Sequence, residues 1–433
     1  GGTECVNLPE KIFVKKDANG NGDGSSWENA INELSTAAFL LHQCKGVKEI
    51  WLAEGTYLPV ENPEELSVPR AAKFIKFYLP TSLSIYGGFI GTESSLTDRD
   101  ESKKSVLSGN ISQLSWVEKN SVDLVSLYTE ETVQPEKSEI LFDALRFEHA
   151  EYAIYQGRFE SRIPNVTIRN TDFTRNGRGI NLSAQNLTIE NSSFSNQSGA
   201  SVSITENGDY QITGNRFYDN DFDPLGVRAS SIIFEDNIFH KNKGQVYVQG
   251  DSSTYIDRCE FLDNITSEPQ TGLSLSRKNL GILTVRGSLI SVRNSVFSNN
   301  NITEDGLNNI DTQATLRIEG VHNTAFISNN TFFNNTYDNT EKIAGAISVN
   351  QRVDSVFIMN TISWKNLEKN SDSYKSGLSI FVDSTAWGDD KIPPYVLVSN
   401  SIIEIGCTGL GEYNLDLYPE FIDTTSSNLD LGL

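Results

Sequence analysis

The chain has 433 residues and a formal net charge of −22 at pH 7, because 57 acidic side chains outnumber 35 basic ones. This balance disfavours nucleic acid or an anionic membrane as partner, since binding phosphate needs clustered Lys and Arg. No stretch approaches the roughly 18 consecutive apolar residues of a transmembrane helix, and aromatic and β-branched residues along the whole chain argue against general disorder.

The first local motif is an acidic, glycine-rich loop over residues 17–28. It fits the pattern D-x-N-x-N-G-x5-E of an EF-hand calcium loop, which makes the following residues candidate ligands: Asp17, Asn19, Asn21, Asp23 and Glu28. Calcium prefers six to eight oxygen ligands, and this spacing can wrap them round one Ca²⁺ ion. The alternative is a run of tight turns, because Asn and Gly favour turns and residues 12–14 read as a strand rather than an incoming helix.

Residues 25–44 predict the only convincing helix of the chain. Ser25 and Glu28 read as a capping box, and an apolar stripe follows them. Cys5 and Cys44 flank this segment, and the four cysteines show no zinc or redox spacing. In an exported protein a Cys5–Cys44 disulfide is therefore plausible, whereas Cys259 lies in a repeat and suits a buried position.

One phrase recurs between residues 141 and 405: apolar-x-apolar, an Asn-rich corner, then an apolar residue that is usually Phe. Its clearest copies place that second anchor at Phe173, Phe194, Phe217, Phe239 and Phe261, every 21 to 23 residues. Later copies end at Phe297 and Phe332, and weaker ones are Phe142…Phe147, Phe357…Ile362 and Val398…Ile403. A fixed period near 22 indicates a repeat architecture.

The repeat favours a right-handed parallel β-helix over a leucine-rich horseshoe. The anchors are Phe, Ile and Val, the returns are rich in Ser, Thr, Asn and Gly, and helix formers are scarce. Stacked coils would turn each Phe into one rung of an internal aromatic column. The Asn residues after each strand suit a left-handed corner, and stacked Asn side chains can bond one another.

We expect one continuous all-β domain, because a solenoid is not bound by the usual globular size limit. The end coils would otherwise expose an apolar face, so the helix at residues 25–44 is placed over the N-terminal mouth. The expected parts are an N-terminal cap over 1–46, irregular first coils over 47–140, regular coils with loop insertions over 141–405, and a C-terminal cap or tail over 406–433.

Catalytic candidates are sparse and weakly supported. Asp219, Asp221 and Asp223 alternate along one corner, where they could form an acid/base pair, hold calcium or line a plain turn. A lyase needs a base and a positive charge that neutralises a substrate carboxylate. Lys241 and Arg286 are the basic candidates for those two roles, and residues 281–287 faintly resemble a segment of chondroitin and alginate lyases.

Four insertions begin a few residues past successive anchors, at roughly 264–276, 300–312, 334–342 and 365–376. Because coils stack in register, insertions at one corner emerge as one wall, and long loops on a rigid scaffold often carry function. The aromatic residues in or near these insertions and a further loop at 384–390 are candidate sugar contacts: Tyr337, Trp364, Tyr374 and Trp387. The alternative is that the loops shield sheet edges and the aromatics pack beneath them.

Several phrases at both ends carry a family resemblance. They are GSSWENA at 24–30, EIWLAEGTY at 49–57, LSIYGGFIGTE at 83–93, DRD at 98–100, VLSGN at 106–110, VSNSI at 398–402 and YPEFID at 418–423. Together they resemble bacterial β-helix surface proteins of the pectate-lyase-like superfamily, close to the polymorphic outer-membrane-protein-like group. The resemblance implies export, with a signal peptide and an anchor outside this sequence.

The sequence thus predicts a secreted or cell-surface protein that binds an extracellular polysaccharide or cell-surface glycan, with Ca²⁺ as a possible ion. The alternative is a polysaccharide lyase or glycoside hydrolase. Buried carboxylates or a Lys/Arg pair converging in one groove would favour an enzyme. A smooth face lined by Asn, Thr and aromatic residues would favour binding.

Overall fold

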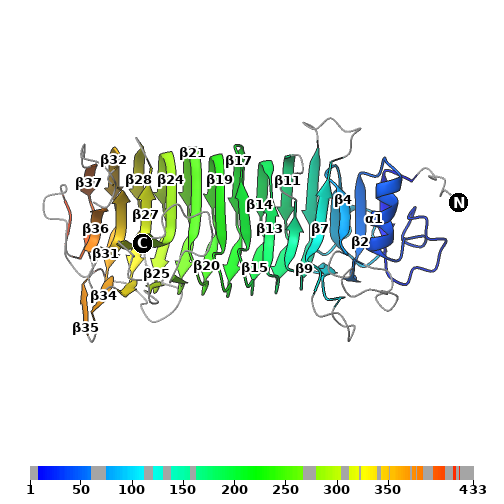
Figure 1. Cartoon of the computed structure of the whole chain (residues 1–433), viewed down its shortest axis with the longest axis horizontal. Helices are drawn as coiled ribbons and strands as arrows, with labels where there is room; N and C mark the ends of the chain where they lie inside the picture. Colours follow the sequence, from blue (N-terminus) through cyan, green and yellow to red (C-terminus); the bar gives the residue numbers. More distant parts are fainter. Residues whose placement is uncertain are drawn as a thin grey trace. The chain divides into compact units, whose positions relative to one another are not determined.

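The computed structural model describes residues 8–59, 75–111, 120–129, 138–156, 162–266, 279–303, 312–320, 323–338, 343–350, 352–370, 373–376, 378–383, 394–404, 413–415 and 419. The chain forms two compact units, residues 1–215 (unit 1) and 216–433 (unit 2). In each unit parallel strands stack as the coils of a β-helix (Figure 1). The predicted all-β solenoid is confirmed.

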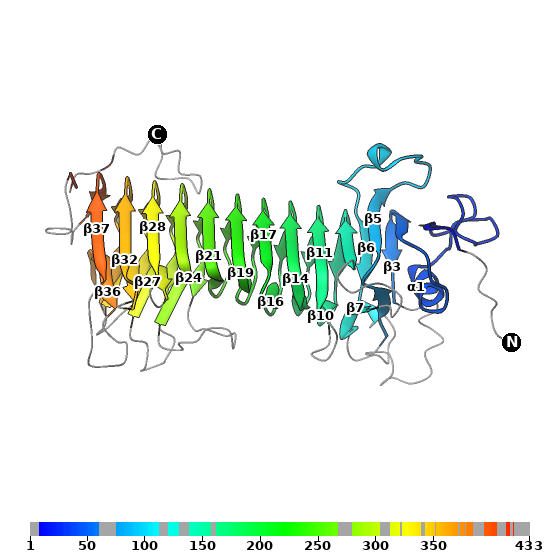
Figure 2. The same ribbon diagram turned by 90° about the horizontal axis from the view of Figure 1, so that it is seen from above.

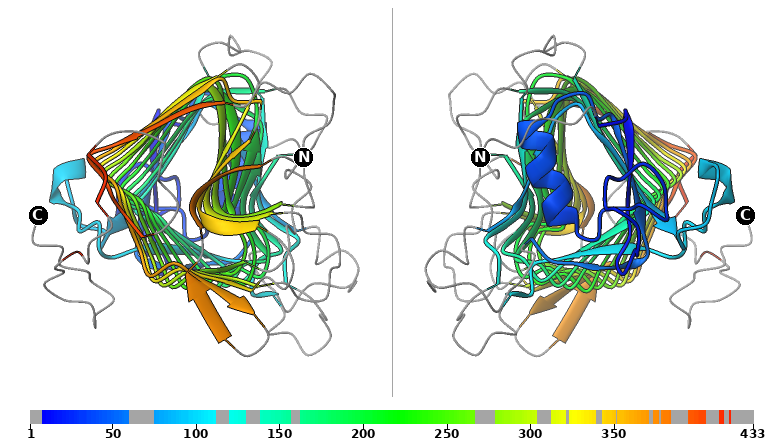
Figure 3. Two further views of the ribbon diagram at one scale, coloured as in Figure 1. Left: turned by 90° about the vertical axis from the view of Figure 1, so that its left-hand side faces the viewer. Right: turned by 90° about the vertical axis from the view of Figure 1, so that its right-hand side faces the viewer.

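The coils of unit 1 have three sides, each made of parallel strands in register (Figure 3). Side A contains β4 (Phe77–Pro80), β7 (Asp123–Tyr128), β10 (Tyr152–Tyr155), β13 (Arg178–Leu182) and β16 (Val202–Thr205). Side B contains β1 (Lys11–Val14), β2 (Glu49–Ala53), β5 (Ser84–Phe89), β8 (Glu139–Asp143), β11 (Ile163–Arg169), β14 (Ala184–Glu190) and β17 (Asp209–Thr213). Side C contains β3 (Gly55–Tyr57), β6 (Ser105–Ser108), β9 (Leu145–Glu148), β12 (Asp172–Thr174) and β15 (Ser193–Ser195).

Unit 2 repeats this plan, but three long strands bend from side A into side B: β19 (Leu225–Glu235), β21 (Val246–Asp257) and β24 (Asn279–Arg293). Side A continues with β27 (Thr312–Glu319), β31 (Ile343–Asn350) and β36 (Leu378–Asp383), and side B with β28 (Thr324–Ser328), β32 (Ser355–Met359) and β37 (Tyr395–Ser399) (Figure 2). Side C contains β18 (Arg216–Tyr218), β20 (Ile238–His240), β22 (Glu260–Leu262), β25 (Val296–Ser298), β29 (Thr331–Phe333), β33 (Ile362–Trp364) and β38 (Ile402–Ile403).

The predicted insertions of unit 2 start from one corner. Each begins with a short strand, and the four strands pair parallel: β23 (Ile265–Thr266), β26 (Asn301–Ile302), β30 (Thr336–Asp338) and β34 (Leu367–Asn370). A fifth strand, β35 (Ser373–Ser376), pairs antiparallel with β34. Stacking in register therefore aligns the described first residues of the insertions along one wall of the coil.

The predicted aromatic column forms the core of both units. In unit 1 the ring of Phe173 stacks on those of Phe147 and Phe194, with centroids 5.0 and 4.8 Å apart. In unit 2 successive rings from Phe217 to Phe332 stack at 4.6 to 5.0 Å. All of these side chains are fully buried, so each Phe fills one rung of the interior.

Left-handed Asn residues turn the corner between sides B and C, as predicted. Their φ angles are 48 to 51° at Asn170, Asn191 and Asn294, a region that Asn tolerates better than most residues. Asn329 donates from Nδ2 to Oδ1 of Asn294 at 3.1 Å, so neighbouring corners are also tied by side chains.

The helix is shorter than predicted and begins later. The helix α1 spans Leu34–Gln43, with Glu33 rather than Ser25 at its N-cap. Residues 24–31 are instead hydrogen-bonded to strand β1. The N–H of Phe13 donates to Gly24 O, and the N–H of Ile31 donates to Phe13 O. The predicted capping box is therefore wrong, but α1 lies across the end of unit 1 and packs on β4, as expected of a cap (Figure 3).

The sequence pattern predicts Phe357 and Ile362 as the core positions of a weak repeat copy, and this prediction is wrong by one residue. In the structure Ile327 pairs with Ile358, and Phe332 pairs with Ser363. Ile358 therefore points into the core and Phe357 points out, since a shift of one residue moves a strand side chain to the opposite face. The internal Phe column ends at Phe332.

Candidate functional site

The predicted calcium loop is closed by its own hydrogen bonds. Nδ2 of Asn21 donates to Oδ2 of Asp23 at 2.8 Å, and the N–H of Ser25 donates to Oδ1 of Asp23 at 2.9 Å. Hydrogen bonds from Ser25, and then from Asn21, lower the pKa of the Asp23 carboxyl. All five candidate ligands, including Asp17, Asn19 and Glu28, are exposed. An ion bound there would have to replace the contacts of Asn21 and Asp23.

No three His, Cys, Asp or Glu side chains within the described ranges gather closely enough to hold a metal ion. The loop at residues 17–28 draws two of its candidate ligands from Asn, which this criterion does not include. Calcium binding at the loop therefore stays a prediction.

The acidic run at residues 219–223 does not bring its carboxylates together. Asp219 is exposed at a left-handed corner, with φ of 54°. Asp221 is also exposed and forms an ion pair with Lys243 at 2.7 Å. Asp223 is buried, and its Oδ1 accepts a hydrogen bond from the N–H of Gln245 at 2.8 Å. This arrangement is typical of a structural corner rather than an acid/base pair.

Lys241 occupies the same corner one rung further along, with φ of 55°, and its side chain is exposed. The N–H groups of Asp219 and Lys241 donate to carbonyl groups of the next coil, His240 O and Leu262 O. The two residues thus share a backbone role. Lys241 lies on side C's corner, and Arg286 belongs to a strand of side A.

The four aromatic candidates have different surroundings. Tyr337 is fully buried, and its hydroxyl lies 2.7 Å from Oγ1 of Thr315, so the prediction that it contacts a sugar is wrong. The short strand β30 turns it inward. Trp364 is half-buried at the end of β33. The side chain of Tyr374 and the whole of Trp387 lie outside the described residues.

Arg286 stands in an outward-facing polar row on side A of unit 2, which we name the arginine row. Register places Arg228 of β19 beside Gln249 of β21, Gln249 beside Arg286 of β24, and Arg286 beside Glu319 of β27. Flat parallel strands thus align four long polar side chains from segments that are far apart in the sequence.

Side-chain hydrogen bonds join the first half of this row. The Tyr247 hydroxyl donates to Oε1 of Gln249 at 2.6 Å, and Nε2 of Gln249 donates to Oδ1 of Asp251 at 2.7 Å. Arg228 completes the chain with an ion pair to Oδ2 of Asp251 at 3.1 Å. Burial opposes ionisation of Asp251, but hydrogen bonds from Gln249 and Arg228 outweigh it and lower the pKa of this carboxyl.

Arg286 has the unusual position in the row. Glu319, its neighbour in register, forms an ion pair with the buried Arg317 at 2.9 Å, and Asp251 is engaged by Arg228. Arg286 is half-buried, hydrogen-bonds to Tyr247, and forms no ion pair with any residue that the structure describes. A partly desolvated cation without a counter-ion is costly, which makes this guanidinium a candidate for binding an anion.

Tyr247 is a titratable group that hydrogen-bonds to Arg286. Burial, reinforced by the charge of Glu319, raises the pKa of Tyr247 to about 12, although Arg286 acts in the opposite direction. The hydroxyl is therefore protonated at neutral pH. It can donate or accept a hydrogen bond, but it is not a ready base.

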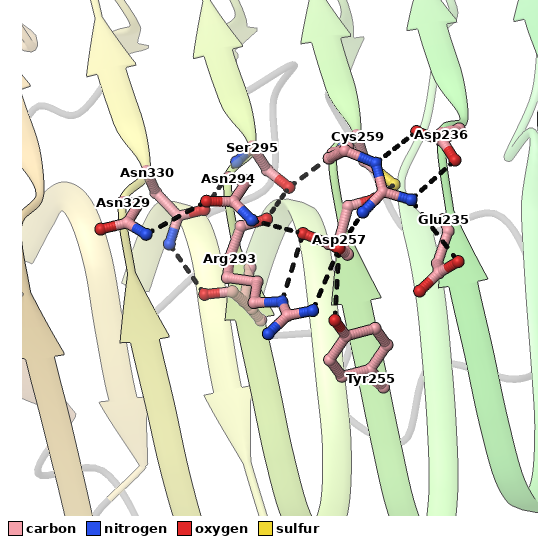
Figure 4. Close-up of polar contacts among 12 residues, drawn as sticks. Glu235, Asp236, Tyr255, Asp257, Cys259, Arg293, Asn294, Ser295, Asn329 and Asn330 are labelled. Carbon is pink, nitrogen blue, oxygen red and sulfur yellow. Dashed lines mark hydrogen bonds and ion pairs between the residues drawn. The ribbon is translucent and has the colours of Figure 1, made fainter. Parts of the chain in front are cut away.

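A second dense polar cluster lies at the corner after side B of unit 2 (Figure 4). Asp257, 1% exposed, accepts hydrogen bonds from Asn294 Nδ2 at 2.7 Å and the Tyr255 hydroxyl at 3.2 Å, and it contacts Arg258 and Arg293. The carboxylate is fully engaged by protein groups. This cluster therefore stabilises the corner, unlike the arginine row, where Arg286 forms no ion pair with the residues that the structure describes.

Sequence reasoning missed most of the arginine row. Tyr247, Gln249, Asp251 and Glu319 occupy strand positions and belong to no motif. A signal does exist: YVQGD at 247–251, TVRG at 284–287 and RIEG at 317–320 all place polar side chains two residues apart before or around a Gly. Only alignment of the coils in register reveals that these polar positions share one face.

The cysteines follow the sequence reasoning in part. Cys44 is disulfide-bonded, whereas Cys259 is free and fully buried, which raises the pKa of its thiol to about 12. The two remaining cysteines, Cys5 and Cys407, lie outside the described residues. Cys5 as the partner of Cys44 stays a prediction.

The repeat and its register agree with a known family. A model described as the right-handed β-helix region matches residues 119–220 and 178–362, which together span more than half of the chain. The chain belongs to the right-handed β-helix family. No curated protein sequence matches this β-helix protein. Within the described residues it has no helix that is long and apolar enough to cross a membrane.

Three solved structures are similar to this β-helix protein. The catalytic domain of a GH87 α-1,3-glucanase in complex with nigerose has 12% identity and a TM-score of 0.32, over 89% of this chain and 70% of that one. The A-module of an Azotobacter vinelandii mannuronan C-5 epimerase has 13% identity and a TM-score of 0.28, over 86% of this chain and 97% of that one. A surface adhesin of Streptococcus pneumoniae has 13% identity and a TM-score of 0.21, over 84% of this chain and 94% of that one. Similarity at this level says nothing about what the present protein binds.

Proposed function

We propose that the protein is a secreted or cell-surface scaffold that binds saccharides, and that the arginine row of unit 2 recognises a sugar bearing a carboxylate. The observation that carries this proposal is the half-buried Arg286 guanidinium, which has no counter-ion among the described residues. A guanidinium binds a carboxylate through two parallel hydrogen bonds, which gives both affinity and orientation.

The groups around Arg286 suit the rest of a sugar. Gln249 and Tyr247 are buried and hydrogen-bonded to each other, whereas the half-buried carboxylates of Asp251 and Glu319 keep lone pairs that can accept from sugar hydroxyl groups. With Arg228 and Arg317, the row and its neighbours carry three guanidinium groups against two carboxylates. This excess of positive charge offsets locally the −22 charge of the whole chain.

Binding is better supported than lysis at this row. Abstraction of a proton beside a uronate carboxylate needs a base near neutral pH. The pKa of Tyr247 is raised to about 12, so its phenolate is scarce at neutral pH. Asp219, Asp221 and Lys241 belong to a corner of side C rather than to side A. A polysaccharide lyase or glycoside hydrolase is therefore the alternative that the experiment below must exclude.

Several further features fit an extracellular setting. The disulfide of Cys44 is compatible with an oxidising compartment. The terminal phrases that resemble bacterial surface proteins support membership of the pectate-lyase-like superfamily and its polymorphic outer-membrane-protein-like group. Contacts from Trp364, Tyr374 and Trp387 to a glycan are part of the same proposal.

Titration of the protein with oligogalacturonate and oligomannuronate, followed by calorimetry, tests the proposal. We expect binding of at least one acidic oligomer. Arg286→Ala should weaken it about 10- to 100-fold, because a charge-assisted pair contributes roughly 1.5–3 kcal/mol. Arg286→Lys should recover only part of the affinity, since an ammonium group cannot make the two-pronged contact.

Arg216→Ala is the matched control, because Arg216 is an exposed arginine on side C of the same unit. Its affinity should equal that of the unchanged protein. Equal loss in both variants, or no binding of either oligomer, would contradict the proposal. Appearance of unsaturated product absorbance during the titration would favour the lyase instead.

We also propose that the loop at residues 17–28 binds Ca²⁺. Millimolar calcium should raise the melting temperature of the protein, because an ion that binds only the folded loop stabilises it. Asp23→Ala should abolish the shift, and Asp209→Ala, which removes an exposed carboxylate in the same unit, should leave it unchanged. A shift of equal size in both variants would show only a general effect of the salt.

A further inference from the structure

We propose that unit 2 carries a second saccharide site on side B, formed by the outward face of β28, β32 and β37, and that it takes an uncharged polysaccharide chain. Register aligns Phe326 with Phe357, and Phe357 with Leu397, on this face. Met359 and Tyr395 complete its apolar part. The remaining outward positions, 324, 328, 355 and 399, hold only Ser or Thr. We name these nine positions the uncharged face.

The uncharged face leaves large apolar groups in water. Tyr395 is 58% exposed and Phe326 is 38% exposed, and Leu289 on the adjacent strand is 50% exposed. Single exposed apolar residues are ordinary, but several exposed apolar side chains gathered on one face of a sheet indicate a binding surface. Folding alone gives no reason for this row, because Ala325, Ile327 and Ile358 already fill the core below it.

The rings form a continuous row along the stacking direction. The centroids of Phe326 and Phe357 lie 5.2 Å apart with their planes 14° from parallel, and those of Phe357 and Tyr395 lie 6.1 Å apart at 61°. Tyr395, at the end of this row, is the most exposed of the three rings, so it is the ring most accessible to a sugar.

Charge decides which occupant fits. None of the nine outward residues is charged, although the chain carries 57 acidic and 35 basic side chains. The charged cluster of the preceding coils ends at Arg293 of β24 (Figure 4). An anionic or cationic polymer would lose its hydration on this face without gaining an ion pair.

Hydrogen-bonding groups flank the rings and favour a saccharide over a purely apolar partner. Ser and Thr hydroxyls alternate with the rings, and Asn360 and Asn400 are exposed at the corner beside them. Rings with neutral donors and acceptors match the alternating apolar faces and hydroxyl rims of a neutral sugar chain. The regular rungs would let successive sugar rings lie along the row.

This site is independent of the arginine row, because it lies on another side of the coil and takes a ligand of a different charge. Calorimetric titration of the full chain with cellohexaose, mannohexaose and laminarihexaose tests it. We expect at least one to bind, with Tyr395→Ala and Phe326→Thr each weakening binding about ten-fold or more through loss of a stacking ring. Tyr395→Phe should keep most of the affinity.

Ile233→Thr is the control, since Ile233 is 43% exposed on side B but lies on β19, outside the uncharged face. It should bind these neutral sugars as the unchanged protein does. Absence of binding by all three hexasaccharides, or equal loss in Ile233→Thr, would overturn the proposal. So would a concentration-dependent dimer in sedimentation that Tyr395→Ala abolishes, because a second copy would then be the occupant.

Discussion

Arg286 and Asp257 show how similar residues acquire different roles in one solenoid. Asp257 contacts Arg258, Arg293 and Asn294, so its negative charge is neutralised by groups of the protein itself. Unit 1 repeats that device at Asp143, which accepts from Asn170, Arg169 and Arg99 at 3.1, 2.8 and 2.6 Å.

In Asp143 and Asp257 alike, the carboxylate ends a strand of side B, and the next coil supplies an Arg in register followed by a left-handed Asn. A buried carboxylate is tolerated only when such partners satisfy it. Arg286 has no equivalent partner among the described residues, and this difference is the basis of the proposed anion site.

Tyr247 gives the arginine row a pH-dependent stability. Burial raises its pKa to about 12, above the value near 10 of a tyrosine in an unfolded chain. Its contribution is complete below about pH 10 and is lost as the pH rises through about 12. We expect the free energy of unfolding, and with it the melting temperature, to fall over this interval. Tyr247→Phe should reduce the fall in free energy by on the order of 2 kcal/mol.

Melting curves between pH 8 and 12, combined with an ultraviolet absorbance titration, measure this effect. Tyr218→Phe is the control, because Tyr218 is an exposed tyrosine of the same unit. The interpretation fails if Tyr247→Phe leaves the alkaline slope unchanged, or if Tyr218→Phe changes it equally.

At the scale of the element, the least expected feature is a ladder of buried Asn side chains inside the corner after side C. It runs through unit 2 at Asn220, Asn242, Asn264, Asn300, Asn335 and Asn366. Nδ2 of each of the first five donates to Oδ1 of the next Asn at 2.8 to 3.0 Å. These amides also satisfy backbone groups that the turning chain would otherwise leave unpaired.

Asn300→Ala should remove several of these hydrogen bonds at once. It leaves the Phe261 carbonyl and the Asn264 N–H without their partners at 2.8 and 3.0 Å. Each orphaned buried group costs about 1–3 kcal/mol, so we expect a loss of at least about 3 kcal/mol in the free energy of unfolding. Urea denaturation measures it.

Ser291→Ala is the control for the ladder, because Ser291 faces outward from β24 in the same coil and is half-buried. Its loss should stay within about 0.5 kcal/mol. A comparable loss of unfolding free energy in both variants would show that the coil is sensitive to any substitution and that the amide ladder makes no particular contribution to stability.

At the scale of the whole molecule, the net charge of −22 shapes behaviour in solution. Like charges on coils and loops repel one another, and salt screens this repulsion over about 10 Å at 0.1 M. We expect the melting temperature to rise when sodium chloride is increased from about 0.01 M to 0.5 M. A fall over the same range would mean that ion pairs, such as that of Asp221 with Lys243, outweigh the repulsion.

The sequence by itself determined the β-helix, the period of its regular coils and its Phe core, because those depend on local periodicity. It also located the left-handed Asn corners. Its predictions failed where long-range contacts determine the structure. The backbone hydrogen bond between Ile31 and Phe13 keeps residues before Leu34 out of α1. Tyr337 points into the core instead of toward solvent.

Both proposed sites were decided by tertiary structure alone. Arg286 and Glu319 meet although they lie in different coils, and one residue of register moved Phe357 from the expected core to the surface beside Phe326. Periodicity along a strand shows which residues alternate. Only stacking of the coils decides which side chains become neighbours, and whether a charge there finds a partner or is left for a ligand.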